Sequence, residues 1–115
     1  MAMGIHSVER RTGPTTIGRD AVVREIYRAL SRINELRDPD DRIACDEETV
    51  LYGSGGALDS LGLVSLILDV ELAVNDLTGG SLVLADAQAM AQRRNPFRDV
   101  RSMVDYVMSR LGAES

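Results

Sequence analysis

The helical spacing of its apolar residues constrains this 115-residue chain more than any other feature. In three segments, apolar side chains recur at steps of three and four residues, which places them on one face of an α-helix. The spacing predicts helices at about residues 17–36, 60–76 and 98–111. Aromatic residues make up only 3% of the chain, so aliphatic side chains must fill the core, and such a core favours helices packed on helices.

The chain before the first helix shows no periodicity, and residues 1–15 are predicted to form a flexible tail. Thr15, Thr16 or Asp20 could cap the first helix, because short polar side chains accept hydrogen bonds from the first backbone N–H groups. Pro39 cannot continue a helix, so the first helix should end shortly before it.

A long connection, residues 38–58, is expected between the first two helices. Loops of this length in compact domains are usually functional or partly packed, and we expect the apolar residues 50–52 to attach this one to the core. A short helix is predicted at about 84–92, since Pro96 interrupts the helical pattern soon afterwards. The chain is therefore expected to form one all-α domain over residues 16–112, a small bundle of three main helices plus one short helix, with a long first loop.

The composition argues against an enzyme. All 13 basic residues are arginine, and without lysine the chain has neither a P-loop lysine nor a Schiff-base lysine. The single histidine, His6, lies in the expected tail, which argues against a Ser-His-Asp triad and against a histidine-based metal site. A single cysteine, Cys45, can form no disulfide within the chain, and this usage suits the reducing cytoplasm. We therefore expect a cytoplasmic protein with no catalytic and no metal-binding residues.

Acidic residues are concentrated in the middle of the chain. The net charge is −5, and residues 38–90 hold eleven acidic residues against one arginine. This stretch would repel the phosphates of a nucleic acid and attract a basic protein surface. The longest apolar stretches are too short to cross a membrane. We therefore expect no nucleic-acid partner and no membrane span.

The helix predicted at 60–76 has three kinds of side chain around its circumference. Five apolar residues fall on one side and should face the core: Leu63, Leu66, Ile67, Val70 and Val74. Small or polar residues lie opposite and should face water: Gly62, Ser65, Asp69, Ala73 and Asp76. The third sector consists of Leu61, Val64, Leu68, Glu71 and Leu72. Its apolar residues form a second stripe, which indicates either a face for a partner, which we favour, or wider burial against the long connection.

Residues 53–56, Gly-Ser-Gly-Gly, precede this helix and do not match a phosphate-binding loop. They lack the GxGxxG spacing, and no Lys-Ser or Lys-Thr pair follows them. Ser60 is also not part of a GxSxG nucleophile elbow, since Leu58 and Gly62 flank it where two glycines would be needed. We interpret residues 53–56 as a flexible hinge.

Asp59 and Ser60 stand where the second helix is expected to begin. A serine at this point is exposed among unpaired backbone N–H groups, which would stabilise an attached phosphate by about 0.3–1 kcal/mol through the helix dipole. Asp59 could cap the helix, and it could also help to hold a divalent ion in the active site of a modifying enzyme. The pair could equally be a helix start with no further function.

Residues 58–66, with the pattern Leu-Asp-Ser-Leu-x-x-Val-x-Leu, open an amphipathic helix and resemble the acyl carrier protein family. The resemblance is strong over residues 58–74 and looser over the rest of 17–111. It implies that Ser60, beside Asp59, carries a covalent 4′-phosphopantetheine cofactor. The face read by partner enzymes would then be Leu61, Val64, Leu68, Glu71 and Leu72.

The resemblance implies a carrier protein rather than an enzyme. A phosphopantetheinyl transferase would attach the arm, whose thiol would hold an acyl or aminoacyl group as a thioester for delivery between loading enzymes and acyltransferases. Ser65 and Leu72 stand where many family members carry glutamate, which favours a stand-alone carrier of a specialised biosynthetic pathway. We expect this carrier to be a monomer. The alternative is an unmodified helical interaction module or a homodimer, using the apolar stripe between Leu61 and Leu72.

Overall fold

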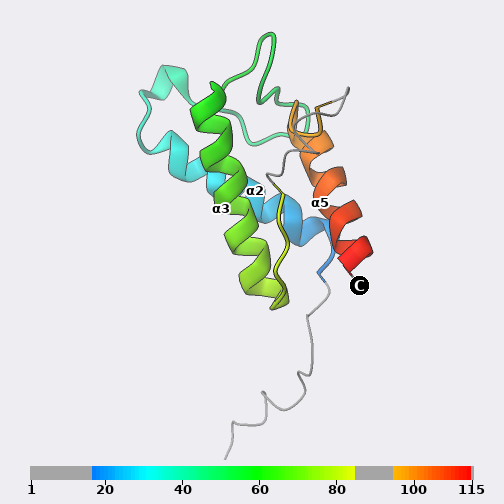
Figure 1. Cartoon of the computed structure of the whole chain (residues 1–115). Helices are drawn as coiled ribbons and strands as arrows, with labels where there is room; N and C mark the ends of the chain where they lie inside the picture. Colours follow the sequence, from blue (N-terminus) through cyan, green and yellow to red (C-terminus); the bar gives the residue numbers. More distant parts are fainter. Residues whose placement is uncertain (1–16, 85–94, 115) are drawn as a thin grey trace, which may run out of the picture.

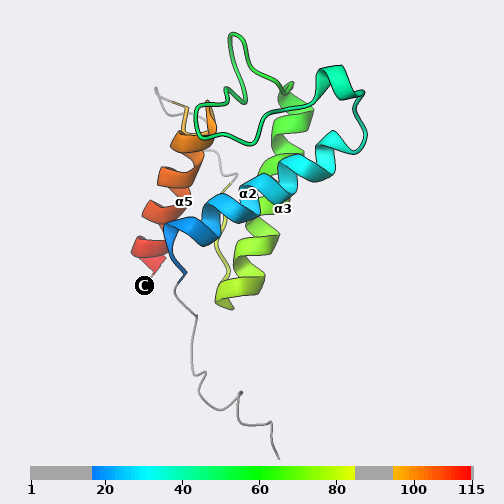
Figure 2. The same ribbon diagram turned by 180° about the vertical axis from the view of Figure 1, so that it is seen from behind.

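The structure, a computed structural model, describes residues 17–84 and 95–114. Within these ranges it is mostly helical and has no strand, and its α-helices are α2 (Arg19–Asn34), α3 (Ser60–Thr78) and α5 (Val100–Glu114). Helix α2 lies across the other two and packs against both, as Figures 1 and 2 show from opposite sides. The three main helices predicted from the spacing of apolar residues are therefore confirmed.

The described residues include only some of the other predicted parts of the chain. The tail predicted over residues 1–15 lies outside the described residues, as does the short helix predicted at 84–92 apart from Leu84, which is buried and not helical. The long connection between α2 and α3 is present and contains a short 3-10 helix, η1 (Pro39–Asp41). None of the helices in the described ranges has the length and apolar character needed to span a membrane.

The helices pack through the faces that the sequence predicts. All five core-facing residues of α3 are buried: Leu63, Leu66, Ile67, Val70 and Val74. They share one cluster with buried residues of α2 and α5: Val22, Ile26, Ala29, Leu30, Val100, Met103, Val104 and Val107. Burying one large apolar side chain stabilises a fold by about 1.5–3 kcal/mol. Burial of this cluster is therefore the main contribution to the packing of the three helices.

The face of α3 that is expected to meet water is only partly exposed. Ser65 is exposed, whereas Gly62, Asp69 and Ala73 are half-buried. Helix α2 approaches α3 on this side, where Arg32 Nε lies 3.7 Å from Asp69 Oδ2. The prediction is therefore confirmed for Ser65 and Asp76 and only in part for the other three residues, because helical spacing alone does not show where a neighbouring helix crosses.

Two asparagine side chains hold the chain where it leaves a helix. The Asn34 amide donates to Ile43 O at 2.9 Å and accepts from Ile43 N at 2.7 Å. Asn75 forms the same pair of hydrogen bonds with Leu82, at 3.0 and 2.8 Å. Each amide thus satisfies the backbone of a segment that folds back along the helix, and α2 ends at Asn34 rather than at residue 36.

Helix α2 begins without a side-chain cap. Its N-cap residue is Gly18, whose carbonyl accepts the first hydrogen bonds of the helix. Asp20 lies in the first turn and does not cap, so this candidate is wrong, although its negative charge suits the positive end of the helix dipole. The other two candidates, Thr15 and Thr16, lie outside the described residues.

Backbone hydrogen bonds join the long connection to the start of α5. Leu51 N and Tyr52 N both donate to Arg98 O, at 2.7 and 3.2 Å, and Val50 pairs with Asp99 as an isolated antiparallel bridge. Leu51 is fully buried, Tyr52 is half-buried and Val50 is exposed. The predicted attachment to the core is confirmed for Leu51, which is buried in it, and for Tyr52, which packs against it. It is wrong for the side chain of Val50, because this residue joins the connection to the chain before α5 through its backbone bridge with Asp99.

Glu47 connects the long connection to two helices. Its carboxylate accepts hydrogen bonds of 2.6 and 2.9 Å from the guanidinium of Arg19 at the start of α2, and Arg101 of α5 lies 3.6 Å away. The hydrogen bonds from Arg19 lower the pKa of Glu47 below its ordinary value. This carboxylate is therefore charged at neutral pH and ties three parts of the molecule together.

Candidate functional site at the start of α3

The candidate site is the first turn of α3. Asp59 is the N-cap residue, with an extended backbone and a carboxylate that accepts a hydrogen bond from Gly62 N at 2.7 Å. The capping role predicted for Asp59 is therefore confirmed. Ser60 is the first helical residue and is exposed. The turn thus places Ser60 in contact with solvent at the positive end of the helix dipole.

Tyr52 is the hydrogen-bond partner of Ser60. Its phenol oxygen lies 3.0 Å from Ser60 Oγ, and either atom can be the donor. A phenol does not draw the proton from a serine as an imidazole or a carboxylate does, so the two residues do not form a nucleophile and its base.

A glycine-rich turn brings Tyr52 to Ser60. Gly53 and Gly55 have left-handed backbones, with φ of 98° and 78°, and Gly56 N donates to Gly53 O at 2.9 Å. A Cβ on Gly56 would lie 2.7 Å from Tyr52 Cα, so only glycine fits at this position. Where the sequence predicts a flexible hinge, residues 53–56 form a hydrogen-bonded turn that packs against Tyr52.

The contact between Tyr52 and Ser60 is the part of the site that the sequence does not predict. From the sequence, Tyr52 is expected only to pack on the core. The glycine run beside it is the feature that could have indicated a close return of the chain, because adjacent glycines often mark places where backbone meets backbone.

Four apolar side chains form an exposed stripe along α3 that begins beside Ser60. The exposed fractions are 76% for Leu61, 40% for Val64, 46% for Leu68 and 66% for Leu72. We call these four residues the apolar stripe. Within the described ranges the long connection does not bury them, so the stripe is exposed to solvent.

Glu71, the fifth residue predicted for this face, is engaged elsewhere. It is half-buried, and its Oε2 accepts a hydrogen bond from Leu84 N at 2.7 Å. The carboxylate therefore holds the segment that follows α3. As a result, the exposed part of this face is more apolar than the sequence suggests.

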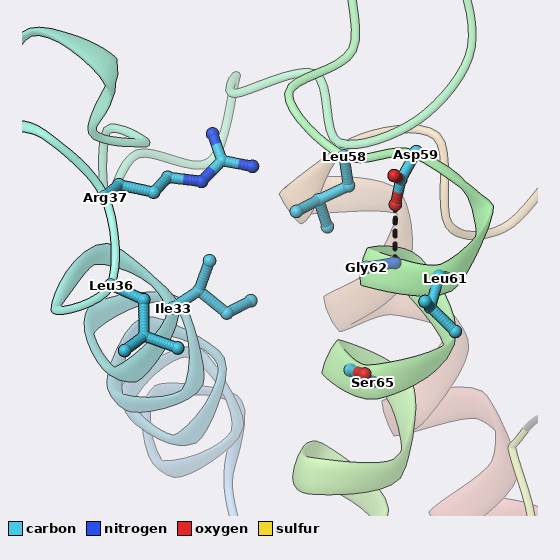
Figure 3. A pocket seen from close by; sticks show the side chains of 8 residues that line it. All are labelled: Ile33, Leu36, Arg37, Leu58, Asp59, Leu61, Gly62 and Ser65. Atoms are coloured by element: carbon cyan, nitrogen blue, oxygen red, sulfur yellow. Dashed lines mark hydrogen bonds between the residues drawn. The ribbon is translucent and has the colours of Figure 1, made fainter.

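An open pocket lies beside the first turn of α3, between this turn and the end of α2 (Figure 3). Apolar side chains from both sides line it: Ile33, Leu36, Leu58 and Leu61. Arg37 stands at the α2 side and donates to Asp41 O at 3.2 Å and to Ala57 O at 3.0 Å. The guanidinium thus holds the long connection in place, and the pocket adds apolar surface next to Ser60.

The polar side chains of the first turn of α3 are engaged in hydrogen bonds. The carboxylate of Asp59 is directed to Gly62 N, and the partner of Ser60 is a phenol. Within residues 17–84 and 95–114, no three His, Cys, Asp or Glu side chains lie close enough together to hold a metal ion. The described residues therefore offer Ser60 a defined position but no base.

The chain matches no family model, no curated protein and no solved structure. The resemblance of residues 58–74 to acyl carrier proteins is therefore neither supported nor opposed by a relative.

Proposed function

We propose that the protein is a carrier that holds an acyl or aminoacyl group as a thioester on a 4′-phosphopantetheine arm attached to Ser60. The observation that carries this proposal is the position of Ser60, an exposed serine that opens α3 directly after the capping residue Asp59. The resemblance of residues 58–74 to acyl carrier proteins favours the same attachment point. A carrier needs no base of its own, because the transferase activates the serine hydroxyl.

The first turn of α3 suits an attached arm in two ways. The phosphate of the arm would lie at the positive end of the helix dipole, which stabilises it by about 0.3–1 kcal/mol. The long arm would also keep its cargo near each docked enzyme, and this tethering raises the effective concentration of the cargo at the active site.

The apolar stripe would serve as the docking face for the transferase, the loading enzyme and the acyltransferase. Leu72 contributes no charge to this face, and the carboxylate of Glu71 is held by Leu84 N. Partner surfaces should therefore be more apolar and less basic than those that read an acidic helix. Such a dedicated set of partners fits a monomeric carrier in a specialised cytoplasmic pathway.

Loading with coenzyme A and a broad-specificity phosphopantetheinyl transferase tests the proposal. Intact mass spectrometry should show one added phosphopantetheine on the wild type and none on Ser60→Ala. Ser65→Ala is the matched control, because Ser65 is exposed on the same helix and its loss should leave loading unchanged. An unchanged mass of the wild type would overturn the carrier function.

The apolar stripe also favours a second function, an unmodified helical interaction module or a homodimer. In that case the stripe would be buried against a partner or a second copy, and Ser60 would only begin the helix. Sedimentation equilibrium distinguishes the two functions. A dimer that Leu72→Gln dissociates, together with no uptake of phosphopantetheine, would favour the module, whereas a monomer loaded at Ser60 would favour the carrier.

A further inference from the structure

We infer that Tyr52 is a positioning residue for the arm: its phenol holds the Ser60 hydroxyl before modification and donates a hydrogen bond to the phosphodiester afterwards. This inference rests on the proposed function, because it concerns the group attached to Ser60. It is carried by the 3.0 Å contact between the two side-chain oxygens and by the way the chain fixes Tyr52.

The backbone around Tyr52 is held from several directions. Its N–H donates to Arg98 O at 3.2 Å, and Leu58 N donates to Leu51 O at 2.9 Å across the glycine turn. Gly56 packs directly against the backbone of Tyr52, and the ring itself is half-buried. The phenol is therefore pre-organised beside Ser60, and little conformational freedom is lost when it binds a group there.

Modification changes which atom can donate. A bond forms between Ser60 Oγ and phosphorus of coenzyme A while the P–O bond to the adenosine 3′,5′-bisphosphate breaks. The bisphosphate leaves with the electron pair, and the serine proton passes to a base of the transferase. Ser60 Oγ then has no hydrogen, so the contact persists only with Tyr52 as donor. A charged phosphoryl oxygen is the stronger acceptor beside it.

Among the described side chains, the one in contact with Ser60 that could donate to the phosphodiester is the neutral phenol of Tyr52. Arg37, the cation that lines the neighbouring pocket, donates to the backbone carbonyls of Asp41 and Ala57. The carboxylate of Asp59 lies next to the attachment point and repels a phosphate. The phenol of Tyr52 is already placed at Ser60 and therefore takes this role.

The loading rate tests the first half of the inference. Tyr52→Phe keeps the ring and removes the hydroxyl, and its kcat/KM for loading should fall about fivefold, which converts to about 1 kcal/mol for one hydrogen bond. Tyr106→Phe is the matched control, because it also removes one phenol, here bonded to Arg110 at 3.1 Å on α5. The control should load at the wild-type rate, and an unchanged rate for Tyr52→Phe would overturn a role before modification.

Phosphorus NMR of the loaded proteins tests the second half and separates positioning from a structural role. The phosphodiester resonance should differ between the wild type and Tyr52→Phe and should coincide between the wild type and Tyr106→Phe. Coincident resonances for the wild type and Tyr52→Phe would refute the hydrogen bond to the arm. A wild type that takes up no phosphopantetheine would instead overturn the proposed function.

If Tyr52→Phe does not fold, the inference can still be tested on the wild type alone. The carbon resonance of Tyr52 Cζ should move on loading, because its hydroxyl becomes a fixed donor to a charged group. The Cζ resonance of Tyr106 should stay in place. Equal positions of the Tyr52 resonance before and after loading would overturn the inference.

Discussion

At the scale of single residues, the neighbours Asp59 and Ser60 have different roles: Asp59 caps α3, and the hydroxyl of Ser60 contacts Tyr52. Asp59 accepts the hydrogen bond from Gly62 N that starts α3, which leaves the Ser60 hydroxyl to its contact with Tyr52. A Cβ on Gly62 would lie 3.2 Å from Asp59 Oδ1, so the glycine leaves room for the capping carboxylate. The start of the helix therefore does not depend on the serine, which can be modified without loss of the cap.

Asp59→Ala should lower the free energy of unfolding by about 1 kcal/mol, the usual loss on removing an N-cap side chain. Urea denaturation monitored by circular dichroism measures this change. Asp76→Ala is the control, because Asp76 is exposed near the other end of α3 and its loss should change stability by no more than about 0.5 kcal/mol. Equal losses in the two variants would contradict the capping role.

The contact between Tyr52 and Ser60 also shows which part of the site lies beyond sequence-based prediction. Asp59 and Ser60 are predicted because capping is local and the residue types are typical of a helix start. Tyr52 reaches Ser60 across the glycine turn, and its backbone is held there by Arg98, which lies far along the chain. Helical or extended spacing carries no information about such a pairing.

At the scale of elements, α3 has two apolar faces with different fates. One face is buried, with Leu66 and Val70 fully inaccessible, and the other is the apolar stripe, with Leu61 and Leu72 mostly exposed. Residues of one chemical type thus serve stability on one side of the helix and, in the proposed function, binding on the other. Position around the helix, and not residue type, decides the effect of a substitution.

Leu66→Ala should lower the free energy of unfolding by about 2–5 kcal/mol, because it leaves a cavity in the core. Leu72→Gln should change it by no more than about 0.5 kcal/mol, because the side chain is already in water. Urea midpoints of the two variants and the wild type give the comparison. A loss at Leu72 as large as the loss at Leu66 would show that the stripe is buried in solution.

The elements themselves follow closely from the sequence, and their ends do not. The three helices and the buried face of α3 are predicted because helical spacing is a local property. The end of α2 at Asn34 coincides with a side chain that bonds to Ile43, and α3 extends to Thr78 before Gly79 takes a left-handed backbone. The partners of such side chains depend on the path of the following segment, which local spacing does not specify.

At the scale of the whole molecule, Glu47 joins the long connection to the start of α2 and to α5. Arg19 holds the carboxylate through two hydrogen bonds, and these lower its pKa in the folded protein. A group with a lowered folded pKa contributes stability above its unfolded pKa, and this contribution is lost as the pH falls through the folded pKa. The tie between these three parts should therefore weaken in acid.

Glu47→Gln should lose less stability than the wild type when the pH falls from neutral to below 4.5, the ordinary pKa of this carboxyl group. Urea midpoints at the two pH values measure the difference. Glu48→Gln is the control, because this side chain is 78% exposed and only approaches Arg101, at 3.9 Å, so its variant should follow the wild type. If the stability of Glu47→Gln falls in acid as much as that of the wild type, protonation of Glu47 is not the cause of the loss.

The hydrogen bond from Tyr52 N to Arg98 O links the turn before α5 to the tyrosine that contacts Ser60. The position of this turn therefore affects Ser60, although the two lie far apart in the sequence. Asn95 shapes this turn by accepting from Phe97 N at 2.8 Å, and Asp99 follows within the bridge to the long connection. A one-residue insertion or deletion between Asn95 and Asp99 would displace the tyrosine while leaving every sequence neighbour of the serine intact. If Ser60 carries the proposed arm, such a change in length should slow its loading about as much as Tyr52→Phe does, although it lies far from Ser60 in the sequence.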